Sequence, residues 1–407
     1  MIDITDPRRK YIVNELRQIS LLEISAISLQ MNMQTKFKNI AKTIVQFLSV
    51  LLLVWHPLSA EAQQSKLNIT KATSFKANKG IFSTPEITVG DIGAVSSHDK
   101  HVYFFDNHGL LINSYKTRGW IHASPSDLSS GEICVGSYDG FIYFFNNLGE
   151  YLRKIKPGGF IFTRILEVDD DHIFFGTNKG GMQLYNLRKN SAHIIHTRKL
   201  AHGSPMRMND GTIVAGANDR NLYFANKEGQ VKNKFKTTGR IIYSRPVELT
   251  DGNIAVGSYD RKLYIVSPEG EQVATFKTKG CIHGTPLQLP DNNIAFGSFD
   301  GSLYIVDSCA NFIASFKTNK KIVASPLLIQ DSIIVVASFD KNIYFLDLEA
   351  NLLATYYAGG RMFSSPKVFY NGLVVVATMK GDVLFLEASH KDNVQDHALA
   401  KPTTLHE

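Results

Sequence analysis

The sequence predicts an all-β fold, an eight-bladed β-propeller built from four-stranded antiparallel blades. Two landmarks recur with a step of about 40 residues. The first is a Ser/Thr-Pro dipeptide, and the second is a Ser-x-Asp triplet such as Ser97-His98-Asp99. Each period also holds enough alternating apolar and aromatic residues for four short strands. A repeat of this length with four strands is typical of propeller blades.

The dipeptide defines eight units that fill residues 66–390. Arg164-Ile165 occupies the one position where the dipeptide is missing. The dipeptides are Thr84-Pro85, Ser124-Pro125, Ser204-Pro205, Arg245-Pro246, Thr285-Pro286, Ser325-Pro326 and Ser365-Pro366. A constant spacing over this length indicates one repeat array, so a single domain accounts for most of the 407 residues.

Four strands, A to D, are expected in each unit. Strand A contains the dipeptide, and strand B is the apolar run before the triplet, such as 253–257. Strand C follows the triplet, as in 263–266, and strand D ends in Phe-Lys-Thr, as in 273–278. Asp-Gly, Asn-Gly and Gly-Glu pairs between these segments suit the tight turns of antiparallel hairpins.

The two ends of the array predict how the ring closes. Residues 73–76 match a D strand that no A, B or C strand precedes, whereas the last unit stops after a C strand at 382–386. An N-terminal D strand that completes the last blade would leave no open sheet edge. The polar residues 391–407 lack this periodicity and are expected to form a flexible tail.

Residues 1–62 have a different character from the repeats. Basic residues precede the apolar run 44–55, and Ala60-Glu61-Ala62 follows it, as in a secretory signal peptide cleaved after Ala62. Met31 or Met33 would then be the true start. An uncleaved anchor is the alternative, although the run is shorter than the ~20 residues that span a membrane. The protein is therefore expected in the bacterial periplasm or outside the cell.

The cysteines give no sign of a disulfide framework. Cys134, Cys281 and Cys309 are odd in number and widely spaced, and none lies at the expected cleavage site, where a lipid anchor would need one. An exported protein without obvious disulfides fits a bacterial periplasm better than a eukaryotic secretory route.

The repeat motifs point to a known family. Units that combine Ser-Pro, Val-Gly-Ser-Tyr-Asp, Leu-Tyr-x-Val and Phe-Lys-Thr resemble the repeats of the pyrroloquinoline-quinone (PQQ) enzyme-like propellers. That family includes quinone-dependent alcohol dehydrogenases. It also includes non-enzymatic periplasmic members, such as the propeller subunit of the outer-membrane protein assembly machinery. The resemblance implies the propeller fold strongly and the function weakly.

Several departures favour the non-enzymatic members. The quinoprotein enzymes carry adjacent cysteines and repeated tryptophans, but here no two cysteines are adjacent and only Trp120 lies in the repeats. No c-type haem attachment motif occurs. We therefore expect a binding or scaffolding module without a cofactor. A PQQ-dependent oxidoreductase or a carbohydrate-active enzyme is the alternative.

Charge is expected to separate onto two faces of the propeller. The D–A and B–C turns share one face, and no Asp or Glu occurs in the eight D–A segments, whereas acids gather in the A–B and C–D turns. The basic residues singled out are Lys79, Arg118, Arg240, Lys279, Lys320, Lys321 and Arg361. This face would attract a protein, an anionic polymer or a glycan. Solvated surface lysines are the alternative.

Several further expectations about partners follow from export and charge. Nucleic acid is not expected, because an exported protein would not meet it. Peripheral association with the cell envelope and a monomeric state are expected.

Polar residues in strand A suggest a ligand site in the central channel. Asp127, Glu167, Arg207 and Glu248 stand two residues after the proline position, and Arg164 and Arg245 replace the usual Ser or Thr beside it. These six residues are expected to line the channel and to hold a small polar ligand or ion. Mutual salt bridges are the alternative. In the enzyme hypothesis, Glu167 and Glu248 would serve as acid and base.

Three histidines stand three residues before the proline position. His122, His202 and His283 lie in alternate units and are weak candidates for a metal site. The favoured interpretation is structural, with each histidine hydrogen-bonded to a neighbouring turn.

Overall fold

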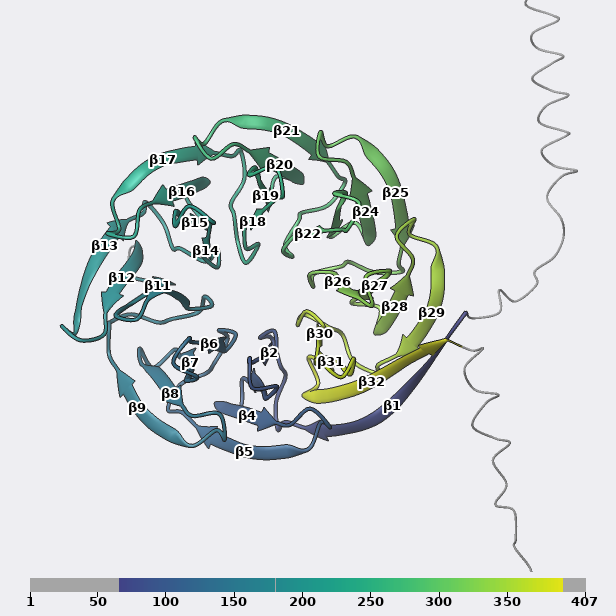
Figure 1. The fold of residues 1–407 in the computed structure, drawn as a ribbon, viewed down its shortest axis with the longest axis horizontal. Helices are drawn as coiled ribbons and strands as arrows, with labels where there is room; N and C mark the ends of the chain where they lie inside the picture. The colour runs from purple at the N-terminus through teal and green to yellow at the C-terminus, as the bar shows by residue number, and fades with distance from the viewer. Residues whose placement is uncertain (1–65, 180, 391–407) are drawn as a thin grey trace, which may run out of the picture. The chain divides into compact units, whose positions relative to one another are not determined.

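A computed structural model describes residues 66–179 and 181–390. This part of the chain forms eight four-stranded antiparallel sheets arranged as the blades of a ring (Figure 1). The eight-bladed propeller predicted from the repeat spacing is therefore confirmed. The expected signal peptide (1–62) and C-terminal tail (391–407) lie outside the described residues.

Strand A is the innermost and shortest strand of each blade (Figure 1). In blades 1 to 8 it is β2 (Glu86–Ile87), β6 (Ser126–Asp127), β10 (Leu166–Asp169), β14 (Met206–Arg207), β18 (Val247–Glu248), β22 (Leu287–Gln288), β26 (Leu327–Ile329) and β30 (Lys367–Val368). Proline at its start donates no hydrogen bond, which a central strand could not tolerate but an edge strand can.

Strands B and C form the buried middle of each blade. Strand B is β3 (Gly93–Ser96), β7 (Ile133–Gly136), β11 (His172–Thr177), β15 (Ile213–Gly216), β19 (Ile254–Gly257), β23 (Ile294–Gly297), β27 (Ile333–Ala337) and β31 (Val374–Ala377). Strand C is β4 (His101–Phe105), β8 (Ile142–Phe145), β12 (Gly181–Asn186), β16 (Asn221–Ala225), β20 (Lys262–Val266), β24 (Ser302–Val306), β28 (Asn342–Leu346) and β32 (Asp382–His390). Their continuous apolar runs reflect burial against a neighbouring blade on each side.

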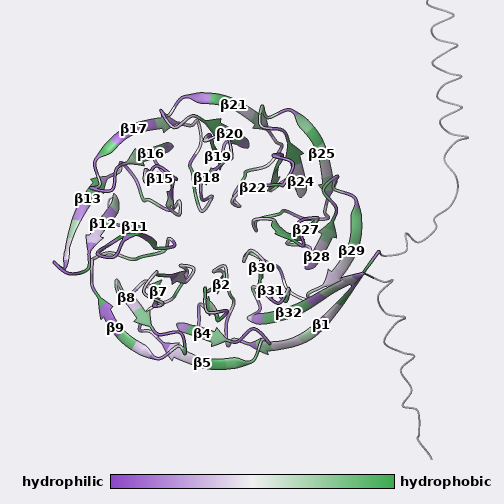
Figure 2. Cartoon of the chain, in the orientation of Figure 1, coloured by the Kyte–Doolittle hydropathy of each residue, from purple (hydrophilic) through white to green (hydrophobic). Residues whose placement is uncertain are grey.

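Strand D lies on the outside of the ring, where hydrophilic and hydrophobic residues alternate (Figure 2). It is β5 (Leu111–Lys116), β9 (Tyr151–Ile155), β13 (Ser191–His196), β17 (Val231–Lys236), β21 (Gln272–Lys277), β25 (Phe312–Lys317), β29 (Leu352–Tyr357) and β1 (Leu67–Lys76). The hydrophobic core is distributed between blades. For example, Val95 and Phe105 of blade 1 pack with Val375 and Phe385 of blade 8.

The N-terminal strand β1 completes blade 8. It pairs antiparallel with β32 from Leu67 opposite His390 to Lys76 opposite Asp382, and the two ends of the ring lie side by side in Figure 1. Phe75 of β1 contacts the rings of Tyr103 and Phe105 in blade 1, so this strand also joins the last blade to the first. Within the described residues, no helix is long and apolar enough to cross a membrane.

Candidate functional site

Aromatic side chains close one end of the central channel. They stand three residues before the proline position, except where Val323 does so, and we call them the aromatic plug: Phe82, His122, Phe162, His202, Tyr243, His283, Val323 and Phe363. The ring of Phe363 in blade 8 lies 5.5 Å from that of Phe82, 5.9 Å from that of Tyr243 and 4.9 Å from that of His283. Because these contacts cross the channel, the plug separates the channel from the face formed by the D–A and B–C turns.

The three histidines of the plug have separate partners and do not converge on one point. His122 Nδ1 lies 3.1 Å from His98 Nε2, His202 Nδ1 lies 2.8 Å from the Asn218 amide, and His283 Nδ1 lies 3.1 Å from the Val323 carbonyl. Residues 66–179 and 181–390 contain no group of three or more potential metal ligands. His122 and His202 thus bind the middle residue of a B–C turn, as the structural interpretation expects.

A ring of hydroxyl groups lies next to the plug, one residue before each proline position. In six of the eight units the backbone N–H donates to the hydroxyl of the next unit, as from Thr84 to Ser124 at 2.9 Å and from Thr285 to Ser325 at 2.8 Å. Ser365 donates to Thr84 at 3.3 Å, so the ring closes between the last and first blades. Arg164 and Arg245 interrupt this ring because neither offers an acceptor.

The structure corrects four of the six channel predictions. Asp127, Glu167, Arg207 and Glu248 point to the preceding blade and do not line the channel pocket. Their partners lie in or beside its A–B turn: Val89 N–H for Asp127, Ser129 for Glu167, the Val168 carbonyl for Arg207 and Asn209 N–H for Glu248. Side chains alternate along a strand. The residues directly before and directly after the proline therefore face the channel, whereas the residue two positions after the proline, where these four stand, faces away from it.

Arg164 and Arg245 do line the channel pocket, together with Lys367, and Glu86 pairs with two of these three cations. The sequence reasoning missed both Lys367 and Glu86. Both terminal nitrogens of Arg164 donate to the carboxylate of Glu86, and Lys367 Nζ lies 3.8 Å from the same carboxylate. Glu86 and Lys367 follow the proline in blades 1 and 8. The sequence does mark these two residues as unusual, because the other six blades carry a neutral residue at the same position: Ser126, Leu166, Met206, Val247, Leu287 and Leu327.

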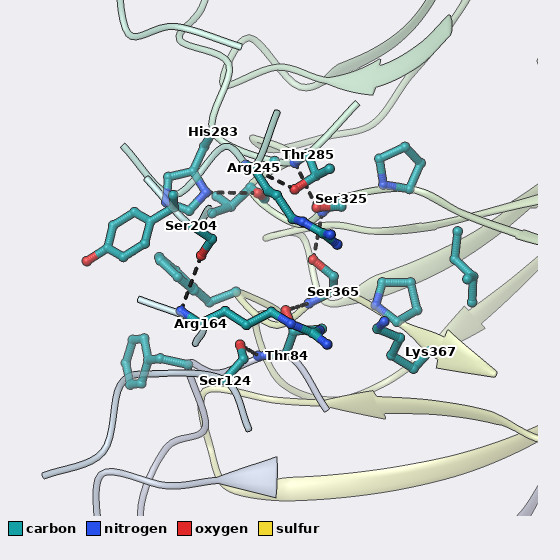
Figure 3. Close-up of a pocket in the computed structure, with 18 of the residues that line it drawn as sticks. Thr84, Ser124, Arg164, Ser204, Arg245, His283, Thr285, Ser325, Ser365 and Lys367 are labelled. Atoms are coloured by element: carbon teal, nitrogen blue, oxygen red, sulfur yellow. Dashed lines mark hydrogen bonds between the residues drawn. The ribbon is translucent and has the colours of Figure 1, made fainter. Parts of the chain in front are cut away.

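Arg164, Arg245 and Lys367 line a pocket of about 240 Å³. The plug and the hydroxyl ring form one end, and Lys367 and Leu327 line it farther along strand A. Figure 3 shows Arg164 and Arg245 extending in the same direction, away from His283 and toward the side where Lys367 lies. The pocket is therefore positively charged at the end away from the plug.

The basic face is the ring of D–A and B–C turns on the other side of the plug. Lys79, Arg118, Arg240, Lys279, Lys320 and Arg361 are all exposed there. Lys321 is half-buried, with its ammonium 4.8 Å from the Phe299 ring and 4.4 Å from the Phe339 ring. Trp120 and Phe160, in equivalent D–A turns, are 51% and 47% exposed. This face thus presents both cations and large aromatic groups.

The aspartates of the B–C turns do not neutralise this face at its surface. In the six blades that have one, the carboxylate accepts a backbone N–H of the adjoining D–A turn; the aspartates are Asp99, Asp139, Asp219, Asp260, Asp300 and Asp340. Asp260, for example, accepts from Gly239 N–H at 2.9 Å and from the Tyr264 hydroxyl at 2.8 Å. These carboxylates are half-buried, whereas most of the cations project into solvent.

The channel residues do not fit a PQQ site. The three cysteines are free, Cys134 is buried inside blade 2, and none lines the pocket. Glu86 is the carboxylate of the charged cluster, and it is already shared by Arg164 and Lys367. The described residues offer neither adjacent cysteines nor a set of carboxylates for a metal ion at this position.

Comparison with known proteins identifies the fold. No family model matches the chain, and no curated protein matches it in sequence. Among solved structures, BamB from Moraxella catarrhalis superposes with a TM-score of 0.66 at 14% identity, covering 79% of this chain and 100% of BamB. The computationally designed protein Ika8 superposes with a TM-score of 0.64 at 15% identity, covering 77% of this chain and 98% of Ika8. Since a designed protein matches about as well as a natural one, the likeness establishes the fold and leaves the function to be argued from the residues.

Proposed function

We propose that the protein is an exported, non-catalytic binding module that docks an acidic protein surface on its basic face. The observation that carries this proposal is the difference between the two kinds of charge there. The cations of the D–A turns are exposed, whereas the aspartates of the B–C turns are engaged with the backbone. The face therefore presents a positive field to a partner.

Exposed aromatic groups favour a protein as the partner. Trp120 and Phe160 lie beside the cations, and Trp120 stacks on His98 with ring centroids 5.7 Å apart. Aromatic and Arg side chains are enriched where protein interfaces gain most of their binding energy. The signal-like pattern that ends at Ala62 supports export, and the structural likeness to BamB is compatible with a scaffolding role.

The two carboxylates of the enzyme hypothesis do not face one substrate. Glu167 and Glu248, the residues of the enzyme hypothesis, each accept a backbone N–H from a different neighbouring blade. A general acid and base must face one substrate, and these two carboxylates serve as links between blades.

Partner capture tests the proposal. The immobilised protein should retain a specific protein from its own periplasm at low salt. Capture should weaken about tenfold or more as salt rises from ~50 to ~300 mM, because solvent-exposed charges are screened. The triple variant K279E/K320E/R361E should lose the same partner.

A matched control distinguishes the basic face from net charge. K189E/K227E/K232E makes the same charge change at exposed positions near the C–D turns, on the opposite face. This control should keep the partner. Equal loss in both variants, or capture that neither salt nor K279E/K320E/R361E affects, would contradict the proposal. Retention of an acidic polysaccharide but of no protein would show that the partner belongs to another class.

A further inference from the structure

The charged cluster in the channel has more positive than negative groups. Arg164, Arg245 and Lys367, from blades 3, 5 and 8, line one pocket, and Glu86 of blade 1 joins them through its contacts with Arg164 and Lys367. Three of them are cations and one is an anion. Arg164 uses both oxygens of Glu86, and Lys367 approaches the same carboxylate at 3.8 Å. One carboxylate therefore serves two cations and leaves no acceptor for the third.

Arg245 is that third cation. Its Nε is buried without a hydrogen-bond partner, and no acidic side chain of residues 66–179 and 181–390 forms an ion pair with it. Burial, and then the charge of Arg164, lower the pKa of Arg245 to about 10, so it still carries its charge at neutral pH. Burial also lowers the pKa of Lys367. Both side chains are half-buried, and an anion that partners them would offset the hydration they have lost.

The other titratable groups near the pocket do not supply the missing anion. His122 and His283 are neutral at pH 7, because burial lowers their pKa values to about 4 and about 3. Asp127 lies nearby, but its carboxylate accepts Val89 N–H at 3.0 Å, and burial raises its pKa. The positive excess around Arg245 remains.

The two arginines also leave backbone donors open. In the six intact positions of the hydroxyl ring, an N–H donates to the hydroxyl of the next blade, as from Arg245 to Thr285 at 3.3 Å. Ser124 and Ser204 hold the equivalent ring position in the units before those of Arg164 and Arg245. Within the described residues, the backbone N–H groups of Ser124 and Ser204 have no acceptor. Ser124 and Ser204 line the pocket at its plug end, so these N–H groups add unpaired donors to the site, and such donors are suited to oxygen atoms of an anion.

We propose that the channel pocket binds a small oxyanion that carries at least two negative charges on carboxylate or phosphate groups, held by Arg245 and Lys367. A planar guanidinium matches the paired oxygens of both groups, and a dianion would balance the excess charge. A pocket of about 240 Å³ admits a molecule the size of citrate. The site is distinct from the basic face, because the aromatic plug lies between them.

The repeat itself suggests a variant that separates binding from folding. Serine or threonine occupies the Arg245 position in six of the eight units. R245S should therefore restore an acceptor for Ser204 N–H and remove a half-buried cation that has no ion-pair partner. We expect R245S to melt at a higher temperature than the wild type without ligand and to lose the response to anions.

Thermal melting and calorimetric titration of the full-length protein test the site, with citrate and inorganic phosphate as separate probes. One of them should raise the melting temperature of the wild type in a dose-dependent way, and R245S should weaken its binding at least tenfold. A response to citrate alone would indicate a carboxylate ligand, and a response to phosphate alone would indicate a phosphate ligand. K367M, which keeps an unbranched apolar stem but removes the ammonium group, should also weaken binding and serves as the readout if R245S does not fold.

The matched control is R240S, which removes an exposed arginine on the basic face. It should bind the probe as the wild type does. The proposal would be overturned if sodium chloride at equal ionic strength produced the same shift, if R245S and K367M bound the probe as tightly as the wild type, or if neither probe bound. Capture of a protein partner on the basic face is measured separately, so either proposal can fail without the other.

Discussion

In six blades, one aspartate of the B–C turn connects that turn to the adjoining D–A turn and to strand C. Asp260 accepts hydrogen bonds from Thr238 and Gly239 of the D–A turn, from Lys262 of its own turn, and from Tyr264 of β20. Burial opposes ionisation of this carboxyl, but hydrogen bonds from Thr238, Tyr264 and Ser258 outweigh it and lower its pKa. Recurrence of the aspartate in six units is typical of a structural role, because a catalytic residue would not recur.

Replacing this carboxylate should destabilise the propeller in a pH-dependent way. Asp260→Asn removes a charged acceptor, so the free energy of unfolding at pH 7 should fall by about 1–3 kcal/mol. Because the pKa is lowered in the folded state, the contribution is present above the pKa of the unfolded state, about 4, and is lost as pH falls through the folded value. Urea unfolding should thus show a smaller difference from the wild type at low pH.

Glu269→Gln is the control for this substitution. Glu269 is exposed in a C–D turn and has no hydrogen-bond partner among the described residues, so its replacement should leave stability unchanged at every pH. A stability loss in Asp260→Asn that does not vary with pH would argue against a charged acceptor.

Strand A shows where sequence reasoning reached its limit. The proline spacing located this strand in every blade. However, the strand has only two residues in most blades, so its alternation could not be established from a pattern of apolar residues. Polar residues two after the proline were interpreted as channel-facing, whereas they satisfy backbone groups of the preceding A–B turn. The contacts of the plug, which join blades far apart in sequence, could be predicted only once the ring was known to close.

The N-terminal strand β1 should be essential to blade 8. Without it, β32 would present nine residues of unpaired edge, which is a template for pairing with another chain. A protein that begins at Ala77 should therefore melt at a lower temperature than one that begins at Lys66, and should self-associate. Light scattering at several protein concentrations measures this. A monomeric protein of unchanged melting temperature would show that β1 is dispensable.

At the scale of the whole molecule, closure gives every blade two neighbours. An open repeat array can fray from its ends, because each unit contacts only adjacent units and the end units have one. Here β1 and β32 join the first and last repeats, and Phe75 packs against blade 1. The sequence predicted this closure from the unmatched D strand at one end and the missing one at the other. It could not predict the depth and charge of the channel, which depend on residues brought together from four blades.

Closure should make the ring unfold in one cooperative transition. Tyr143 and Tyr304 occupy equivalent positions in the opposite blades 2 and 6, and their hydroxyls donate to Asp139 at 2.7 Å and to Asp300 at 3.1 Å. Tyr143→Phe and Tyr304→Phe should each reduce stability by about 1 kcal/mol and shift the same single melting transition. Because the two sites share no partner, the effects in the double variant should add. Differential scanning calorimetry should give equal calorimetric and van't Hoff enthalpies for all three variants. Two resolved transitions, each sensitive to only one substitution, would mean that the halves of the ring unfold independently and that closure through β1 does not couple them.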